Sequence, residues 1–271
     1  MIFIDDELIN FESQGVPELP KASCEGYVDN KGAKIWYAVY GTGFPVVLLH
    51  GGLGHSGNWS YQVPAMIDHG YQVVLIDSRG HGRSTRDDQP YTYQLMASDV
   101  IEVMDTLDIA RAGFVGWSDG ADTALILADI APERAAGVFF YGCNMDDSGA
   151  RQITDYGPAL TRCFSRHVKD YARLSPAPDQ FETLIKDVSL MQRTQPNYTA
   201  QDLKRIHVPV WVVYSENDEF IKREHAEYLT DTLPHAKLTI LKDVSHFAPL
   251  QRPDAFNEVM LAFVYTIYHG I

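Results

Sequence analysis

The chain has 271 residues, 45% of them hydrophobic, and a formal net charge of −14 at pH 7. This length can bury a sizeable core in one or two domains. So acidic a surface repels nucleic acid and anionic membranes, which excludes both as expected partners.

The N-terminus lacks the basic and apolar regions of a signal peptide, and no stretch has the length and apolar character needed to span a bilayer. Three widely spaced cysteines, Cys24, Cys143 and Cys163, favour a reducing compartment over a disulfide framework. We therefore expect a cytoplasmic protein that acts as a monomer or homodimer on a small molecule.

The order of apolar patterns predicts an α/β fold. Residues 1–22 are acidic and are expected to form a surface arm, and two alternating segments within 24–40 predict an antiparallel hairpin. Short apolar runs then alternate with helical patterns, which predicts a mostly parallel central sheet flanked by helices. The expected strands are 46–50, 72–77, 112–117, 137–142, 209–214 and 236–243, and the expected helices are 59–68, 92–107, 119–131, 223–232 and 253–268.

One interval, 144–206, interrupts this alternation and contains two amphipathic helical patterns, at 158–172 and 179–192. We expect an inserted helical cap there, on a core formed by 23–143 and 207–271. The cap residues that could line a substrate pocket are Tyr156, Leu160, Phe164, Leu190 and Met191. Packing of a helix face on the core is the alternative role of most of them.

A candidate nucleophile lies in the sequence GWSDG, residues 116–120, which fits the pattern G-x-S-x-G. The pattern follows a predicted strand and precedes a predicted helix, as a nucleophile turn requires. Flanking glycines let the chain make a sharp turn, and the helix N-terminus points its N–H groups toward the site. Ser118 is therefore the expected nucleophile.

A serine nucleophile needs a base and an acid that orients the base. His246 follows the last predicted strand and is the expected base. Asp218 follows the strand at 209–214 and is the expected acid, with Glu216 as the alternative. Five other histidines are expected to be solvated, namely His167, His207, His225, His235 and His269.

The glycine-rich loop at 50–54, HGGLG, follows the first core strand. Its backbone can approach a substrate closely, and we expect the N–H of Gly52, or alternatively Leu53, to stabilise an oxyanion together with the N–H of Asp119. His50 is expected to orient this loop. No metal is expected, because His50 and His55 lie on a loop without carboxylate ligands.

With these motifs assembled, residues 24–270 resemble the α/β-hydrolase superfamily. The matching segments are HGG at 50–52, DSRGHGRS at 77–84, GWSDG at 116–120, SENDEF at 215–220 and VSHFAPLQRP at 244–253. The resemblance implies an α/β-hydrolase fold with a cap, and a scaffold role for Asp77, Arg79 and His81. A serine at position 118 differs from the aspartate of the dehalogenases and epoxide hydrolases.

The turn GWSDG is similar to that of the biphenyl hydrolase-like proteins, which include valacyclovir hydrolase. That resemblance implies that the Asp119 side chain holds a substrate ammonium group; capping of the following helix is the alternative. Trp117 is expected either beside the substrate or packed beneath the turn. The predicted activity is hydrolysis of a carboxylic ester, with an aminoacyl ester as one option, through an acyl-enzyme and without a cofactor.

Three other functions remain open. A carbon–carbon bond hydrolase for ring-cleavage dienoates would use arginine to bind its anionic substrate, for which the cap offers Arg151, Arg162 and Arg166. A lactonase would use the same serine chemistry. A hydrolase-like receptor would instead bind a small molecule without turnover and recruit a partner.

Overall fold

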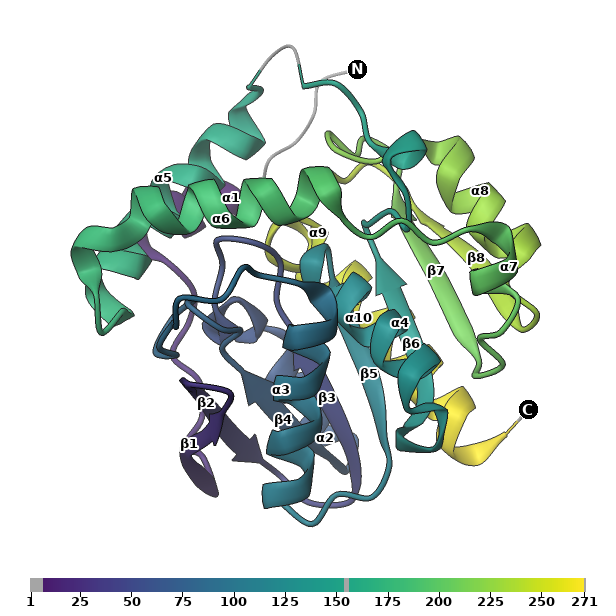
Figure 1. The fold of residues 1–271 in the computed structure, drawn as a ribbon, viewed down its shortest axis with the longest axis horizontal. Coiled ribbons are helices and arrows are strands. Elements are labelled where there is room, and N and C mark those ends of the chain that lie inside the picture. Colours follow the sequence, from purple (N-terminus) through teal and green to yellow (C-terminus); the bar gives the residue numbers. More distant parts are fainter. Residues whose placement is uncertain (1–6, 154–155, 271) are drawn as a thin grey trace.

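One mixed sheet runs through the molecule, with helices on both of its faces (Figure 1). The computed structural model describes residues 7–153 and 156–270. Its strands are β1 (Cys24–Asn30), β2 (Ala33–Tyr40), β3 (Phe44–Leu49), β4 (Tyr71–Ile76), β5 (Ala112–Trp117), β6 (Ala135–Tyr141), β7 (Val210–Ser215) and β8 (Ala236–Leu241). These eight strands lie in the order β1-β2-β4-β3-β5-β6-β7-β8.

The helices complete the expected alternation. They are α1 (Leu8–Gln14), α2 (Gln62–Asp68), α3 (Tyr93–Thr106), α4 (Asp119–Ile130), α5 (Pro158–Leu174), α6 (Phe181–Thr194), α7 (Ala200–Leu203), α8 (Arg223–Thr232), α9 (Ala248–Gln251) and α10 (Pro253–His269). Short 3₁₀ turns are η1 (Ser56–Trp59), η2 (Pro132–Arg134), η3 (Asp147–Gly149) and η4 (Pro178–Gln180). Among the described residues, no helix is both long and apolar enough to cross a membrane.

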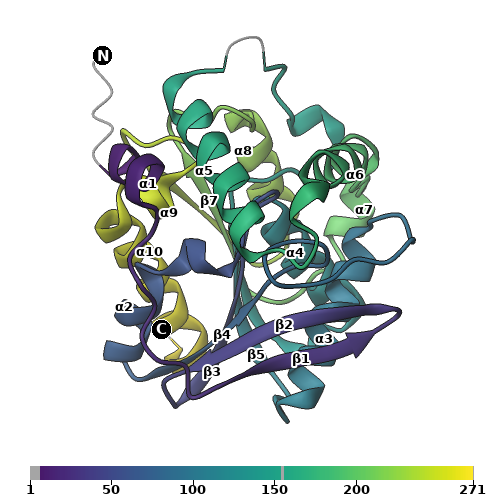
Figure 2. The same ribbon diagram turned by 90° about the vertical axis from the view of Figure 1, so that its left-hand side faces the viewer.

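Strand pairing follows the sequence pattern closely. The hairpin β1–β2 is antiparallel and joins β4, while β3 to β8 pair in parallel, with β3 between β4 and β5. Figure 2 shows the hairpin at one edge of the sheet. Parallel pairing aligns the carboxyl ends of β3, β5, β6, β7 and β8 at one edge, which is where the loops carrying the candidate site residues emerge.

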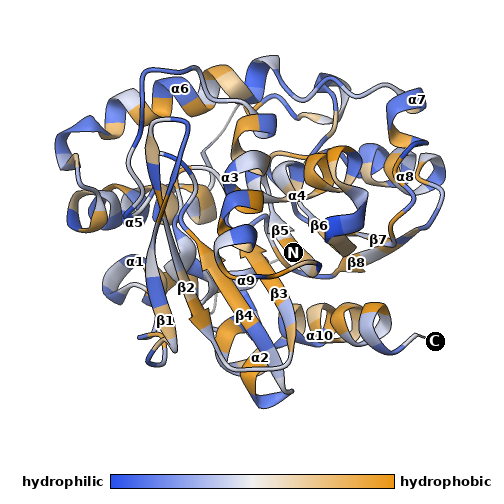
Figure 3. Ribbon diagram, turned by 60° about the horizontal axis from the view of Figure 1, so that its bottom comes forward, coloured by the Kyte–Doolittle hydropathy of each residue, from blue (hydrophilic) through white to orange (hydrophobic). Residues whose placement is uncertain are grey.

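Alternate residues of a central strand serve two separate cores. In β3, Val47 and Leu49 pack in the cluster that includes α3, α4 and α8, while Val46 and Leu48 pack in the cluster that includes α2 and α10. Successive side chains of a strand point to opposite faces, so a strand covered on both sides must be apolar throughout. Figure 3 shows this as hydrophobic colouring along the central strands.

The expected N-terminal arm contains a helix, α1, that the sequence pattern did not reveal. Leu8 and Phe11 are fully buried, and α1 lies against α5. Arg162 of α5 also pairs with Glu12, with 3.5 Å between nitrogen and oxygen. Residues 1–6 of the arm lie outside the described residues.

Between β6 and β7 the described chain forms α5, α6 and α7. Helices α5 and α6 correspond to the two predicted patterns at 158–172 and 179–192. Both lie over the carboxyl end of the sheet in Figure 1. The division of the chain into a core and a cap, with boundaries at 144 and 206, stays a prediction.

The DSRGHGRS loop is built around a buried arginine. The Arg79 guanidinium donates to both carboxylate oxygens of Asp99, at 2.6 and 3.1 Å, and also reaches Asp87 and the carbonyl of Asn30. Asp77 is fully buried too and accepts backbone N–H bonds from Ser56 and Arg83. These contacts tie the loop after β4 to the hairpin, to α3 and to the loop after β3.

We predict that Asp99→Asn destabilises the protein by about 3 kcal/mol, because removing one partner leaves a buried guanidinium with less compensating charge. Thermal or urea unfolding measures the change. The matched control is Glu227→Gln, which removes the exposed partner of Arg223 on α8 and is expected to cost less than about 1 kcal/mol. Equal losses from the two variants would contradict a structural role for the Arg79 cluster.

Candidate active site

Ser118 lies on a strained turn between β5 and α4. Its backbone has φ 53° and ψ −125°, a conformation that a residue with a side chain rarely adopts. Both flanking glycines are sterically required: a Cβ on Gly120 would lie 2.1 Å from the Leu49 carbonyl oxygen, and one on Gly116 would lie 2.4 Å from the Ala121 Cα. The G-x-S-x-G spacing thus follows from the close approach of α4 to β5 and to the end of β3.

His246 and Asp218 form a buried pair beside this turn. The Nδ1 of His246 lies 3.0 Å from Oδ2 of Asp218, and the other carboxylate oxygen accepts the N–H groups of Phe220 and Ile221 at 2.9 Å each. These bonds fix the carboxylate at the end of β7. The alternative acid, Glu216, lies on the surface instead, where it accepts the N–H of Asp243.

The backbone of His246 is held from two further directions. Its N–H donates to Glu219 Oε2 at 2.9 Å, and its carbonyl lies 3.0 Å from the Tyr141 hydroxyl. Burial opposes a charge on the ring, but the charge and hydrogen bond of Asp218, followed by the charges of Glu219 and Asp119, outweigh burial and raise the pKa of His246 above its usual value. The ring is therefore a stronger base than a free histidine.

The glycine-rich loop is oriented by His50, as expected. The ring Nδ1 lies 2.8 Å from the Gly51 carbonyl, and Nε2 accepts the N–H of Ser78 at 2.9 Å, an arrangement that suits a neutral ring. Burial lowers the pKa of His50 to about 4, which keeps the ring uncharged. Gly52 borders the cavity beside Asp119, whereas Leu53 has φ 63° and packs against the core.

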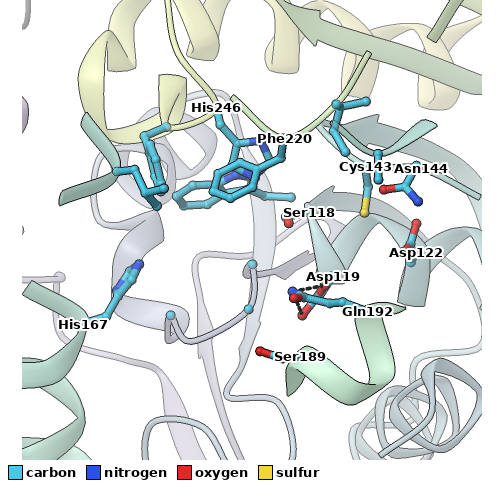
Figure 4. Close-up of a pocket in the computed structure, with 18 of the residues that line it drawn as sticks. Ser118, Asp119, Asp122, Cys143, Asn144, His167, Ser189, Gln192, Phe220 and His246 are labelled. Atoms are coloured by element: carbon cyan, nitrogen blue, oxygen red, sulfur yellow. Dashed lines mark hydrogen bonds between the residues drawn. The ribbon is translucent and has the colours of Figure 1, made fainter. Parts of the chain in front are cut away.

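Ser118 and His246 face one cavity of about 390 Å³, a size suited to a small organic molecule. Figure 4 shows their side chains in this cavity, with those of Asp119, Gln192 and Asp122 nearby. Its lining residues are Gly51, Gly52, Gly54, Asn58, Tyr93, Trp117, Ser118, Asp119, Asp122, Cys143, Asn144, Ala150, Leu160, Phe164, His167, Ser189, Gln192, Arg193, Gln195, Phe220, Ile221, His246 and Phe247.

Of the five cap residues expected in the pocket, two line the cavity. Leu160 and Phe164 do so from α5, but Tyr156 and Leu190 are exposed, at 73% and 50%, and Met191 is buried in the core. The expectation for these last three is wrong. Tyr156 lies outside the helices, in the exposed segment before α5, and the rotation of α6 turns Leu190 and Met191 away from the cavity. On α6 the face toward the cavity carries Ser189, Gln192 and Arg193, and successive residues turn about 100° around the axis.

Trp117 lies both at the cavity wall and beneath the turn, and a contact with substrate stays a prediction. Its ring lines the cavity and packs edge-to-face on Trp59, with 6.0 Å between ring centroids, and on Phe247 at 5.9 Å. The side chain is 3% exposed. Trp117 therefore supports the turn from below and contributes an apolar wall near His246.

The Asp119 carboxylate does not cap α4. It accepts a hydrogen bond from the Tyr93 hydroxyl at 2.9 Å and bonds from the Gln192 amide at 3.0 and 3.1 Å. Burial raises the pKa of Asp119, although these donors and the nearby His246 oppose the shift. Gln192 comes from α6, so this contact joins the segment after β6 directly to the nucleophile turn.

Two histidines predicted to be solvated are buried. His167 of α5 lines the cavity at 7% exposure, and His225 of α8 accepts the N–H of Met145 at 3.1 Å. Burial lowers the pKa of His167 to about 3, so the ring is neutral. The partners of both lie far away in the sequence, which is why the local pattern did not indicate burial. Within residues 7–153 and 156–270, no cluster of His, Cys, Asp or Glu has an arrangement that could hold a metal ion.

Comparisons with known proteins place the chain in a family. The sequence pattern of the alpha/beta hydrolase family matches residues 46–259, and the chain belongs to that family. The predicted fold and the resemblance to the superfamily are thus confirmed; the closer resemblance to biphenyl hydrolase-like proteins stays a prediction.

Individual relatives are described with differing activities. A protein described as a carbamate hydrolase, from Caulobacter sp. strain K31, is 30% identical over 80% of this chain and 90% of its own. A protein described as a non-heme bromoperoxidase, from Mycobacterium tuberculosis H37Rv, is 27% identical over 82% of this chain and 94% of its own. The solved structure of Est816, described as an N-acyl homoserine lactone degrading enzyme, is 28% identical, with a TM-score of 0.71, over 88% of this chain and 100% of its own.

We predict that the acidic limb of the kcat/KM profile has its midpoint above pH 6.5, because a general base must be neutral and the pKa of His246 is raised. Glu219→Gln retains an oxygen that can accept the His246 N–H but removes a negative charge, so the midpoint is expected to move to lower pH. Glu216→Gln, which changes the same residue type outside the site, is the control and is expected to leave the midpoint in place. A shift to higher pH in Glu219→Gln would contradict the electrostatic argument.

Proposed function

We propose that the protein is a serine hydrolase that cleaves a carboxylic ester of a small molecule through an acyl-enzyme. The observation that carries the proposal is the His246–Asp218 pair, at 3.0 Å, whose histidine lines the same cavity as the strained Ser118. Membership of the alpha/beta hydrolase family supports hydrolytic chemistry. That the cleaved bond is a carboxylic ester is our proposal.

In the proposed mechanism, Ser118 Oγ attacks the substrate carbonyl carbon while His246 Nε2 accepts the hydroxyl proton. Asp218 accepts a hydrogen bond from Nδ1 and stabilises the imidazolium that forms. The carbonyl oxygen becomes an oxyanion, which the backbone N–H groups of Gly52 and Asp119 are proposed to stabilise, each by about 3–4 kcal/mol.

The tetrahedral intermediate collapses when the bond to the leaving alkoxide breaks, and His246 returns its proton to that oxygen. The acyl group remains on Ser118. Water then attacks the acyl carbon and gives a proton to His246, and collapse of the second intermediate returns that proton to Ser118. The products are a carboxylic acid and an alcohol, with no net change in the protein.

Lactone hydrolysis is the second candidate, because a lactone is a cyclic ester and Est816 is similar over its whole length. The dienoate hydrolase is less well supported, because the three arginines considered for it make other contacts. Arg151 donates to the Ile221 carbonyl, Arg162 pairs with Glu12 and Arg166 pairs with Asp170, and none of them lines the cavity. A receptor without turnover would retain binding but show no catalytic cycles.

We predict that Ser118→Ala lowers kcat/KM for p-nitrophenyl esters by at least about 10⁴-fold without changing the melting temperature by more than a few degrees. The variant is also expected to lose covalent labelling by a fluorophosphonate. Ser148→Ala, at an exposed serine outside the cavity, is the control. Full activity in Ser118→Ala would refute the proposal, and a panel of esters, a lactone and a dienoate then ranks the substrate classes on the native protein.

We also propose that Asp119 favours substrates with an ammonium group near the scissile carbonyl. Its carboxylate already binds the Gln192 amide, so an ammonium group would replace that donor. Asp119→Asn is expected to lower kcat/KM for aminoacyl esters at least about tenfold more than for plain esters, because bonds between charged groups are the stronger ones. Gln192→Ala retains the carboxylate and is expected to preserve the preference. Equal losses on both ester classes in Asp119→Asn would count against ammonium recognition.

A further inference from the structure

Asp122 is a buried acid in the cavity whose carboxyl oxygens accept no hydrogen bond within residues 7–153 and 156–270. It lies one helical turn after Ser118, whose carbonyl accepts the Asp122 N–H at 3.2 Å. The residue is 1% exposed and its side chain lines the cavity. Among the residues that the structure describes, none makes a hydrogen bond with either carboxyl oxygen. Buried polar groups in proteins are almost always paired, so an unpaired one that faces a cavity indicates a place for a ligand atom.

The surroundings of Asp122 favour its neutral form. Burial raises the pKa of its carboxyl group well above the usual range, and the negative charge of Asp119 adds to the effect. The Cys143 thiol and the Tyr93 hydroxyl act in the opposite direction, but neither makes a hydrogen bond of ordinary geometry with it. A neutral carboxylic acid carries one O–H donor, and within the described chain no acceptor binds this one.

The position of Asp122 relates it to one half of the substrate. In Figure 4, Ser118 lies between His246 on one side and Asp122, Cys143 and Asn144 on the other. In the proposed mechanism His246 protonates the leaving group, so the leaving group lies on the His246 side and the acyl chain extends toward Asp122. This step depends on the proposed function.

We propose that Asp122 is a hydrogen-bond donor that recognises an oxygen acceptor on the acyl chain of the substrate. Because the Asp122 N–H bonds to the Ser118 carbonyl, the backbones of the two residues lie about one helical pitch, ~5.4 Å, apart along α4. That separation suits an oxygen three bonds from the scissile carbonyl carbon. The substrate class is therefore an ester or lactone whose acyl chain carries an oxo or hydroxyl group at the 3-position.

A cationic group is a poorer match to Asp122. An ionised carboxylate needs hydrogen-bond donors to offset its burial, and Asp119 has them in Tyr93 and Gln192. In the described part of the chain no donor makes a hydrogen bond to Asp122, so its complement is an acceptor rather than an ammonium. The two acids would then recognise different substrate groups: Asp119 as an anion and Asp122 as a neutral acid.

The test compares ethyl butyrate, ethyl 3-hydroxybutyrate and ethyl 3-aminobutyrate as substrates of the native protein, Asp122→Asn and Asp122→Leu. Leucine has a similar shape but no polar atoms, while asparagine keeps an N–H donor. For each variant, kcat/KM is divided by its value for ethyl butyrate. This ratio removes any effect of the substitution on acyl transfer itself, which is common to the three esters. Unfolding is measured in parallel, and Asp122→Leu is expected to melt at the native temperature or higher, because it removes an unpaired buried polar group.

The 3-hydroxy preference is kcat/KM for ethyl 3-hydroxybutyrate divided by kcat/KM for ethyl butyrate. We expect Asp122→Leu to lower this ratio about tenfold, because one hydrogen bond is lost. Asp122→Asn is expected to lower it by less than about threefold, because asparagine keeps a donor. The proposal is overturned if the two variants lose the preference equally, if neither loses it, or if the loss falls on the 3-amino ester instead. Binding of the same esters to Ser118→Ala and Ser118→Ala/Asp122→Leu by calorimetry gives a readout that needs no turnover. Absence of hydrolysis by the native protein, with the binding preference intact, would count against the proposed function alone.

Discussion

The close approach of α4 to the ends of β3 and β5 is the constraint on which the site depends. Gly120 touches the backbone carbonyls of Leu49 and His50, where a Cβ would lie 2.1 and 2.7 Å from their oxygens. This contact brings the first turn of α4 against the glycine-rich loop, directly after the strained Ser118. One packing requirement therefore brings together Ser118, the proposed nucleophile, a helix N-terminus and the backbone N–H groups of the glycine-rich loop.

The segment between β6 and β7 reaches this corner through polar contacts. Gln192 of α6 binds Asp119, and Asp170 of α5 lies 3.4 Å from the ring of His55, which caps the 3₁₀ turn after the glycine-rich loop. Arg166 pairs with Asp170, so the acid is itself held in place. Helix α6 is thus tied to Asp119, next to Ser118, and α5 is tied to the loop at His55. A shift of either helix would therefore move Asp119 or the glycine-rich loop.

Sequence patterns predicted those features that depend on neighbouring residues or on chain order. The strand runs, the GWSDG turn and the order of Ser118, Asp218 and His246 are of this kind. Sequence patterns failed where helix formation or burial depends on residues that are distant in the sequence. Helix α1 is only seven residues long and is stabilised by α5, and His167 is buried by elements far from it in sequence. The pocket face of α6 was misassigned because apolar residues were favoured, whereas Ser189, Gln192 and Arg193 are polar and face the cavity.

Asp119 and Asp122 show why residue type alone does not give chemical role. They are three residues apart in the first turn of α4, where the helix dipole favours negative charge at both. Hydrogen-bond donors then separate them: Asp119 receives bonds from Tyr93 and Gln192, and Asp122 receives none from the described chain. Two ionised carboxylates so close together would repel each other in a medium of low polarity, so stabilising the charge on Asp119 favours the proton on Asp122. The cavity consequently contains Asp119, whose charge raises the pKa of His246, and Asp122, the proposed neutral donor. Asp122 lies on the other side of Ser118 from His246 (Figure 4).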